Sequence, residues 1–298
     1  MKKILLATSA LAMTASFAAA EVSISGAAGA GVISGTANTG NMDTGAGRDA
    51  TTESAIWAGV DLNFSASVTT DSGVTVSVAE DIGGGDLADY ADKEINSQRG
   101  DMGDPTVTIA FGATTITIEE NAIDDVYDDD HHGDIGVSTS LGGASVSVVY
   151  KANDTGGAAN KSTSYSVGYT MGDVALSVAG TDNDGDSSGS AMKWSASYTM
   201  GDMTLGLSSD NNGTAPSSTE GSVSYNVGGG LSVSLAADDA DGWDASATYA
   251  AGALTATYAT DEASAWEADV KYDLGGGVSI NAASDSNETS VIGINFSF

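Results

Sequence analysis

The sequence has no cysteine among its 298 residues, which excludes a disulfide framework and any zinc site built on thiolates. It is also poor in basic residues: 9 Lys and Arg stand against 41 Asp and Glu, and the formal net charge is −32. Nucleic acid is therefore excluded as a partner, because phosphate binding draws on clustered Lys and Arg. Beyond the N-terminal segment no apolar run approaches the roughly 18 residues of a transmembrane helix, whereas membrane-spanning strands need only about 9 to 11.

No arrangement of residues points to catalysis. The two histidines, His131 and His132, are neighbours in one acidic stretch, and no Gly-x-Ser-x-Gly elbow sits between a strand and a helix. The sequence therefore predicts no enzyme and no cofactor, although its many carboxylates would bind Ca²⁺ or Mg²⁺ weakly through oxygen. The glycine run Gly83–Gly85 lacks the repeated nonapeptide of a calcium-binding β-helix. The identity of any metal site stays unknown at this stage.

The N-terminus has the pattern of a Sec signal peptide. Lys2 and Lys3 precede an apolar stretch from Ile4 to Phe17, and small residues lead to Ala20. We predict export and cleavage of residues 1–20, with residues 21–298 forming one β domain.

Apolar and polar residues alternate with a period of two through most of that domain, which predicts strands. The alternation is clearest from Val22 to Val32 and from Ile56 to Val68. Tight Gly-centred connections alternate with longer polar ones, the layout of an up-and-down transmembrane barrel with short periplasmic turns. Eight tight turns join sixteen strands, and the first and last strands make eighteen. Sixteen stays open, because residues 106–120 could form a hairpin or a bent pair. The predicted fold is an all-β antiparallel barrel of 16 to 18 strands.

Tyrosine and tryptophan mark the ends of the apolar face. Five tyrosines each stand three residues before the first glycine of a tight turn, and three tryptophans lie four or six residues earlier. Amphipathic rings favour the level of the lipid headgroups, so this spacing predicts two aromatic girdles. The predicted girdle residues are Tyr169, Tyr198, Tyr225, Tyr249, Tyr272, Trp194, Trp243 and Trp266.

The opposite face is polar and charged, which would be costly against hydrocarbon. In a closed barrel of this size the water that this face requires fills the lumen, and so wide a lumen is a channel. The predicted lumen-facing charged residues are Asp61, Lys193, Asp244, Glu267, Asp269, Lys271 and Asp273.

Four short motifs, taken in order, resemble the alphaproteobacterial general porins. They are the start Glu21–Gly26, the turn Thr69–Gly73, the hairpin Tyr272–Gly277 and the end Val291–Phe298. Phe298 is similar to the C-terminal signal by which outer-membrane proteins are recognised for assembly. The resemblance implies a homotrimeric outer-membrane barrel for passive diffusion of small hydrophilic solutes, with the third extracellular loop folded inward. The acidic exposed loops indicate either contact with divalent-bridged lipopolysaccharide, beside the outer-membrane lipid, or solubility in brine.

The third loop, counted from the first strand, falls near Asn121 to Asp134, the most acidic run of the chain. In the family, acidic residues of this loop face basic residues of the wall, but here the expected second strand, Thr51 to Val68, has neither Arg nor Lys. We therefore predict a negative constriction and a preference for cations. The predicted constriction residues are Glu119, Glu120, Asp124, Asp125, Asp128, Asp129, Asp130 and Asp134.

Two other functions stay open at this stage. A surface-exposed or secreted structural β protein, such as an adhesin, would have a similar Gly and Asp content but would be water-soluble and lack aromatic girdles. A closed or plugged barrel that acts as an anchor or receptor would have the same lipid face and no conductance.

Overall fold

The computed structural model describes residues 21–35, 54–98, 100, 102–127, 131–152, 161–184, 190–211 and 217–298. The expected signal peptide lies outside these ranges. The described residues contain no helix long and apolar enough to cross a membrane. They form the strands β1 (Glu21–Ser34), β2 (Ala55–Thr69), β3 (Thr75–Asp89), β4 (Glu94–Ser97), β5 (Thr106–Phe111), β6 (Thr114–Asp124), β7 (His132–Leu141), β8 (Ala144–Lys151), β9 (Lys161–Met171), β10 (Val174–Asp184), β11 (Ala191–Met200), β12 (Met203–Asn211), β13 (Ser218–Gly228), β14 (Leu231–Asp238), β15 (Trp243–Ala251), β16 (Leu254–Asp261), β17 (Trp266–Gly275), β18 (Val278–Asp285) and β19 (Ser290–Ser297).

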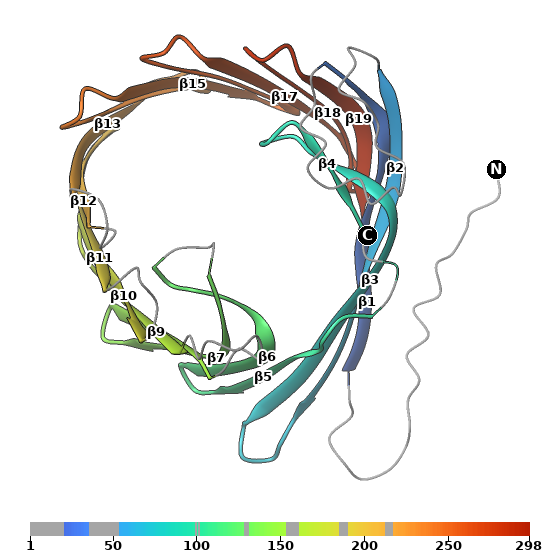
Figure 1. Ribbon diagram of the computed structural model, residues 1–298, viewed down its shortest axis with the longest axis vertical. Helices are drawn as coiled ribbons and strands as arrows, with labels where there is room; N and C mark the ends of the chain where they lie inside the picture. Colours follow the sequence, from blue (N-terminus) through green and yellow to red (C-terminus); the bar gives the residue numbers. More distant parts are fainter. Residues whose placement is uncertain are drawn as a thin grey trace.

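Eighteen of these strands close into one antiparallel barrel, seen end-on in Figure 1. Each barrel strand pairs with its neighbours in chain order, except that β3 pairs directly with β5 because β4 pairs with β3 alone among the described strands. β19 pairs with β1 and closes the ring, and Gly26 and Phe298 exchange two backbone hydrogen bonds of 3.0 and 3.1 Å. The predicted barrel of eighteen strands is confirmed, with residues 106–120 belonging to the β5–β6 hairpin. The closed ring leaves no free sheet edge.

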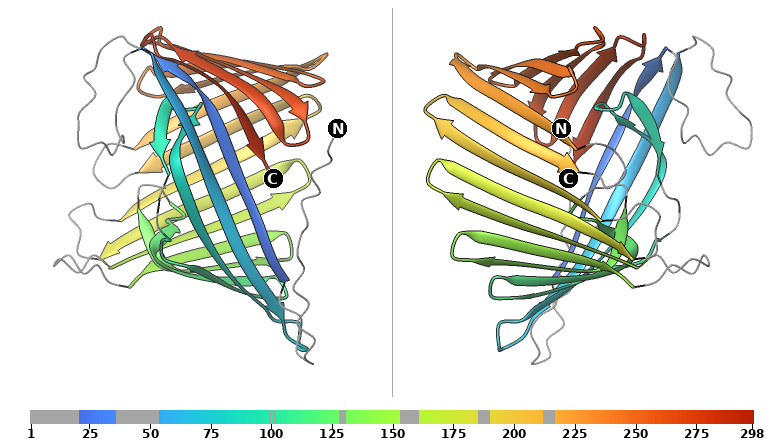
Figure 2. Two further views of the ribbon diagram at one scale, coloured as in Figure 1. Left: turned by 90° about the vertical axis from the view of Figure 1, so that its right-hand side faces the viewer. Right: turned by 60° about the vertical axis from the view of Figure 1, so that its left-hand side comes forward.

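The connections alternate between the two ends of the barrel (Figure 2). At one end, here called the tight-turn rim, consecutive strands are joined by short turns that need a left-handed residue, such as Gly201 with φ of +61°. At the other end, the loop rim, lie the longer connections, including β6–β7 and β12–β13. The β2 strand begins at Ala55, four residues later than predicted.

The two faces of the sheet differ as the period of two predicts. Val22 on β1 and Ile56 on β2 are 70% and 83% exposed, and they share the outward face because Val22 pairs with Ala66 and Val32 pairs with Ile56. The alternate residues of β1, such as Ser23 and Ser25, point into the barrel. The outside of the cylinder is therefore apolar and the inside mainly polar.

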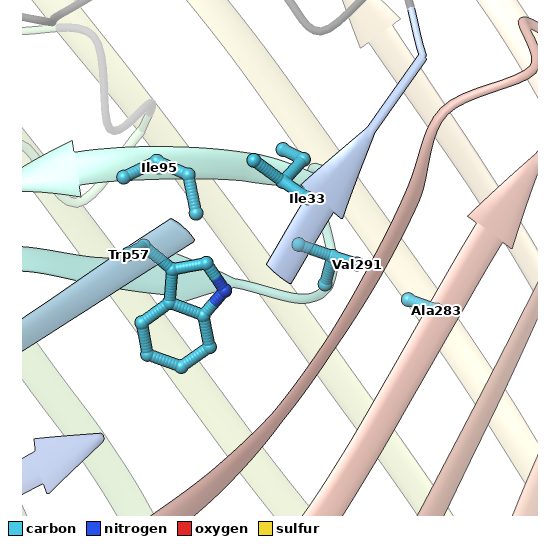
Figure 3. Close-up of a cluster of buried hydrophobic side chains, with 5 residues drawn as sticks. All are labelled: Ile33, Trp57, Ile95, Ala283 and Val291. Atoms are coloured by element: carbon cyan, nitrogen blue, oxygen red, sulfur yellow. The ribbon is translucent and has the colours of Figure 1, made fainter. Parts of the chain in front are cut away.

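One apolar cluster breaks this rule, because it lies inside the barrel. It comprises Ile33, Trp57, Ile95, Ala283 and Val291 (Figure 3), and Trp57 and Val291 are only 2% and 1% exposed. Trp57 follows the outward-facing Ile56 and so points inward. The sequence analysis missed this cluster, because it assigned the inward face to polar residues throughout.

Candidate functional site

The lumen wall of β10 to β16 is lined largely by hydroxyl groups. The Oγ atoms of Ser177 and Ser195 are 2.7 Å apart, as are those of Ser234 and Ser246. Such cross-strand pairs make the wall polar without giving it charge. A wall of this kind offers hydrogen bonds to water and to hydrophilic solutes with little selectivity.

Charge gathers instead where this wall meets the loop rim. Three pairs of acidic residues stand directly opposite each other on adjacent strands and point into the lumen: Glu220 and Asp238, Asp244 and Asp261, and Glu267 and Asp285. We call these six residues the acidic mouth. Like charges directly opposite destabilise a sheet, so six of them in three neighbouring hairpins need a reason beyond stability.

Half of the acidic mouth also shapes the loops. One carboxylate oxygen of Asp238 accepts hydrogen bonds from the backbone N–H groups of Ala240 and Gly242, at 2.9 and 2.8 Å. Asp261 and Asp285 make the same kind of bond to the turns that follow them. Glu220, Asp244 and Glu267 stand instead among the first residues of β13, β15 and β17.

The ends of β6 and β7 that flank the third connection of the loop rim bend into the lumen (Figure 1). The strands on either side run further than predicted, so the loop is limited to residues 125–131. The register of β6 against β7 shifts between Ile118 and Ile123, and Asn121 adopts a φ of +50°. This bulge turns the upper part of β6 away from the wall.

The eight predicted constriction residues do not form one group. Asp128, Asp129 and Asp130 lie outside the described residues. Asp124 belongs to β6 and Asp134 belongs to β7, so the prediction that these two lie within the loop is wrong. Glu119 and Glu120, expected just before the loop, also belong to β6. The Asp134 carboxylate accepts hydrogen bonds from the backbone N–H groups of Asn121 and Ala152, at 2.8 and 2.6 Å, and therefore fixes the bulge. Asp125 accepts one from Tyr127 N–H.

Tyr127 anchors this loop on the lumen wall formed by β9 to β12. Its hydroxyl donates a 2.6 Å hydrogen bond to Asp210 of β12, and the Lys193 ammonium of β11 lies 5.2 Å from its ring centroid. Beside it, Val126 N–H donates to Ser164 Oγ of β9 at 3.1 Å. The side chain is 6% exposed. Sequence analysis missed Tyr127, and its signal was a single aromatic residue inside an acidic run.

The charged residues predicted to face the lumen all have the inward register. On β17, Glu267, Asp269, Lys271 and Asp273 alternate with the outward Val270 and Tyr272. Asp61, Lys193 and Asp244 occupy the same face of their strands. Glu267 forms an ion pair with Lys93, which lies buried inside the barrel.

The predicted girdle residues lie on the outward face, each between 36% and 47% exposed. Each of the five tyrosines is close to the tight-turn rim, as in the pairing of Tyr249 with Leu231. Trp243 and Trp266 are the first residues of β15 and β17, near the loop rim.

Carboxylates come together in one further place. Asp89, Asp92 and Glu94 each place an oxygen within 4.8 Å of the others, at the turn between β3 and β4. Asp89 also accepts hydrogen bonds from the backbone N–H groups of Ala91 and Asp92, so it shapes this turn. In the same turn, burial raises the pKa of the Tyr90 hydroxyl.

Near the third loop, His132 Nε2 lies 3.4 Å from Asp124 Oδ1.

Comparisons with known proteins agree with this geometry. The family model described as Gram-negative porin matches residues 87–291. Two engineered variants of the Rhodopseudomonas blastica porin superpose with a TM-score of 0.55, at 15% and 16% sequence identity, covering 93% of this chain and 100% of theirs. At such identities the likeness shows a shared fold. A comparison with curated proteins finds no match.

Proposed function

This chain belongs to the Gram-negative porin family, and on that premise we propose that its barrel is a water-filled channel of the outer membrane that prefers cations. Small hydrophilic solutes and ions would cross it by passive diffusion. The hydroxyl-lined wall suits this role, because it solvates many solutes and binds none of them tightly.

The acidic mouth is the observation that carries the cation preference. Its six carboxylates face the lumen as three pairs of like charge, and such pairs are relieved when mobile cations gather between them. The lysines nearby already have acidic neighbours: Lys93 is paired with Glu267, and Lys193 stands opposite Asp210. A ring of acidic side chains concentrates cations and repels anions. The third loop and its acidic residues would add to this field at the constriction.

A homotrimer is proposed from the outer surface. The outward tyrosines and tryptophans of the described residues lie on β8 to β17, as Tyr150 and Tyr272 illustrate, whereas β1 to β3 show mainly Val, Ile, Ala and Leu, with Phe64 as their aromatic residue. Glu80 stands opposite Phe64 on the outward face of β3, and its carboxylate oxygens are buried without a hydrogen bond to any described residue. A charge on the lipid face is costly, so neighbouring copies that cover this side would remove the penalty.

The remaining proposals concern export and surroundings. Residues 1–20 would direct secretion, and Phe298, which directly follows β19, would serve as the assembly signal. The outward tyrosine and tryptophan residues would contact the headgroups of outer-membrane lipid and lipopolysaccharide. Ca²⁺ or Mg²⁺ would bind the carboxylates weakly, and no other cofactor is proposed.

Planar-bilayer recordings test this function. Purified protein placed between unequal KCl solutions should show a reversal potential of the sign set by K⁺ movement, and its closures should occur in groups of three. A reversal potential set by Cl⁻ movement at moderate salt would contradict the cation preference. Closures that are always single would contradict the trimer and leave the selectivity standing.

A further inference from the structure

The β3 strand leaves the barrel wall before it ends. Its pairing with β2 stops at Gly85, opposite Gly59, and the last residues, Asp86 to Asp89, pair with β4. Residues 86–97 therefore form a separate hairpin, which we call the inner hairpin. Figure 1 shows its β4 strand inside the ring.

Two glycines allow this departure. Gly85 has a φ of +72°, and a Cβ placed on it would lie 2.2 Å from the carbonyl oxygen of Ala58. A Cβ on Gly59 would lie 2.5 Å from the carbonyl oxygen of Asp86. The β3 backbone thus crosses β2 too closely for any side chain, and the glycine run that carried no ligand motif acts as the bend.

The inner hairpin is packed against the lumen wall by apolar contacts. Ile95 of the hairpin belongs to the same buried cluster as Trp57, Ile33 and Val291 of the wall, and Leu87, Ala88 and Tyr90 pack against it. The cluster is shown in Figure 3. Because the wall residues have inward register, the hairpin occupies the lumen and not the outer surface.

The tip of the hairpin reaches far around the ring. Lys93 Nζ lies 2.5 Å from Glu267 Oε2 on β17, and it also donates to the Ala91 carbonyl at 2.7 Å. Four strands, namely β2, β1, β19 and β18, separate β3 from β17. At about 4.8 Å per strand the hairpin spans roughly 24 Å of wall. Lys93 is 4% exposed although its partner is half-exposed.

We propose that the inner hairpin is a second narrowing element of the pore, and that Lys93 is a positioning residue which holds it against β17. The third loop is anchored on β9, β11 and β12, on the other side of the lumen, so the passage runs between two inserts. The hairpin presents Asp89, Asp92 and Glu94 at its turn and borders a cavity of about 300 Å³ whose lining includes Asp244, Asp261 and Asp285. Cations entering at the loop rim therefore pass the hairpin. The inference rests on the channel function proposed above.

A charge swap tests the positioning role. The Lys93→Glu variant sets like charges against each other at the tip, so the hairpin should detach and single-channel conductance should rise by roughly one and a half to threefold. The double variant Lys93→Glu with Glu267→Lys restores an ion pair and should return conductance to the native value. As both substitutions concern a side-chain contact inside the lumen, the backbone pairing of the barrel strands remains intact.

A thiol reporter follows the hairpin itself, since any introduced cysteine is unique in this chain. In an Ile95→Cys background the buried thiol should react slowly with a charged, membrane-impermeant reagent, at least roughly tenfold faster when Lys93→Glu is added, and slowly again in the double swap. Ser97→Cys, at the exposed end of the same strand, is the matched control and should react rapidly in all three backgrounds.

The outcomes separate this inference from the channel function. A rise in conductance and in Ile95→Cys reactivity, both reversed by the double swap, supports the proposal. Faster labelling with unchanged conductance overturns the narrowing role, and unchanged labelling overturns the positioning role of Lys93. If replacing residues 87–96 by two glycines also leaves conductance at the native level, the hairpin does not narrow the pore. Native protein that does not conduct at all contradicts the proposed function and not merely the hairpin.

Discussion

Neutralising two residues of the acidic mouth, Glu220→Gln together with Asp244→Asn, lowers the K⁺ over Cl⁻ permeability ratio by roughly two- to fivefold. Both side chains are exposed to the lumen at the loop rim, and each stands opposite an aspartate that shapes a turn. Removing them leaves the turns intact and takes two charges from the path of the ions. The measurement is the reversal potential of the double variant in a KCl gradient.

The matched control carries the same charge change at the opposite rim. Asp173 and Asp202 are exposed in tight turns, and Asp173→Asn with Asp202→Asn should shift the permeability ratio much less. Relief of like-charge repulsion should make the mouth variant as stable as the native protein or slightly more stable. Equal shifts in the two double variants would show that overall charge, and not the mouth, sets selectivity.

Arginine placed at two neighbouring positions of β14 should affect two different properties, namely stability at one position and conductance at the other. Leu235 points outward and is 47% exposed, whereas Ser234 points inward and its Oγ lies 2.7 Å from Ser246 Oγ. Leu235→Arg sets a charge against hydrocarbon and should destabilise the barrel, lowering its free energy of unfolding in lipid by about 2 to 4 kcal/mol. Ser234→Arg meets water, so it should leave that free energy almost unchanged while it lowers conductance and cation preference.

Urea titration of barrels folded in lipid vesicles, followed by tryptophan fluorescence, measures both variants. The comparison is internally controlled, because the two sites differ by one residue along a single strand. Similar losses of stability at the two positions would mean that the assignment of faces is wrong.

The barrel could be predicted from the sequence because strands and turns are specified by residues close together in the chain. Alternation of outward residues such as Val270 and Tyr272 with inward residues such as Asp269 and Lys271 follows from the strand repeat, and Gly-centred turns fix where each strand ends. Strand number and closure follow from counting these signals. The third loop was located by the same count, although its flanking strands extend through Asp124 and from His132, beyond what turn residues alone indicate.

The inserts inside the lumen were not predictable in the same way, because they depend on contacts between distant segments. Trp57, Ile33 and Val291 are apolar residues on the face otherwise given to polar ones, and their partner, Ile95, is distant in sequence from all three. Their inward register was a usable signal, since a large apolar side chain that faces a water-filled lumen is expected to be buried by another segment of the chain. The partners of Lys93 and Tyr127 could not be identified from the sequence, because Glu267 and Asp210 become their neighbours only in the folded barrel.

The central claim is that the closed sheet surrounds a continuous column of water, narrowed but not filled. The most direct measurement is the single-channel conductance of the native protein across a range of KCl concentrations. The account predicts discrete conductance steps that grow with bulk conductivity at high salt and stay higher than proportional at low salt, where the acidic mouth concentrates K⁺. Correctly folded barrels that insert into the bilayer without any conductance steps would contradict it.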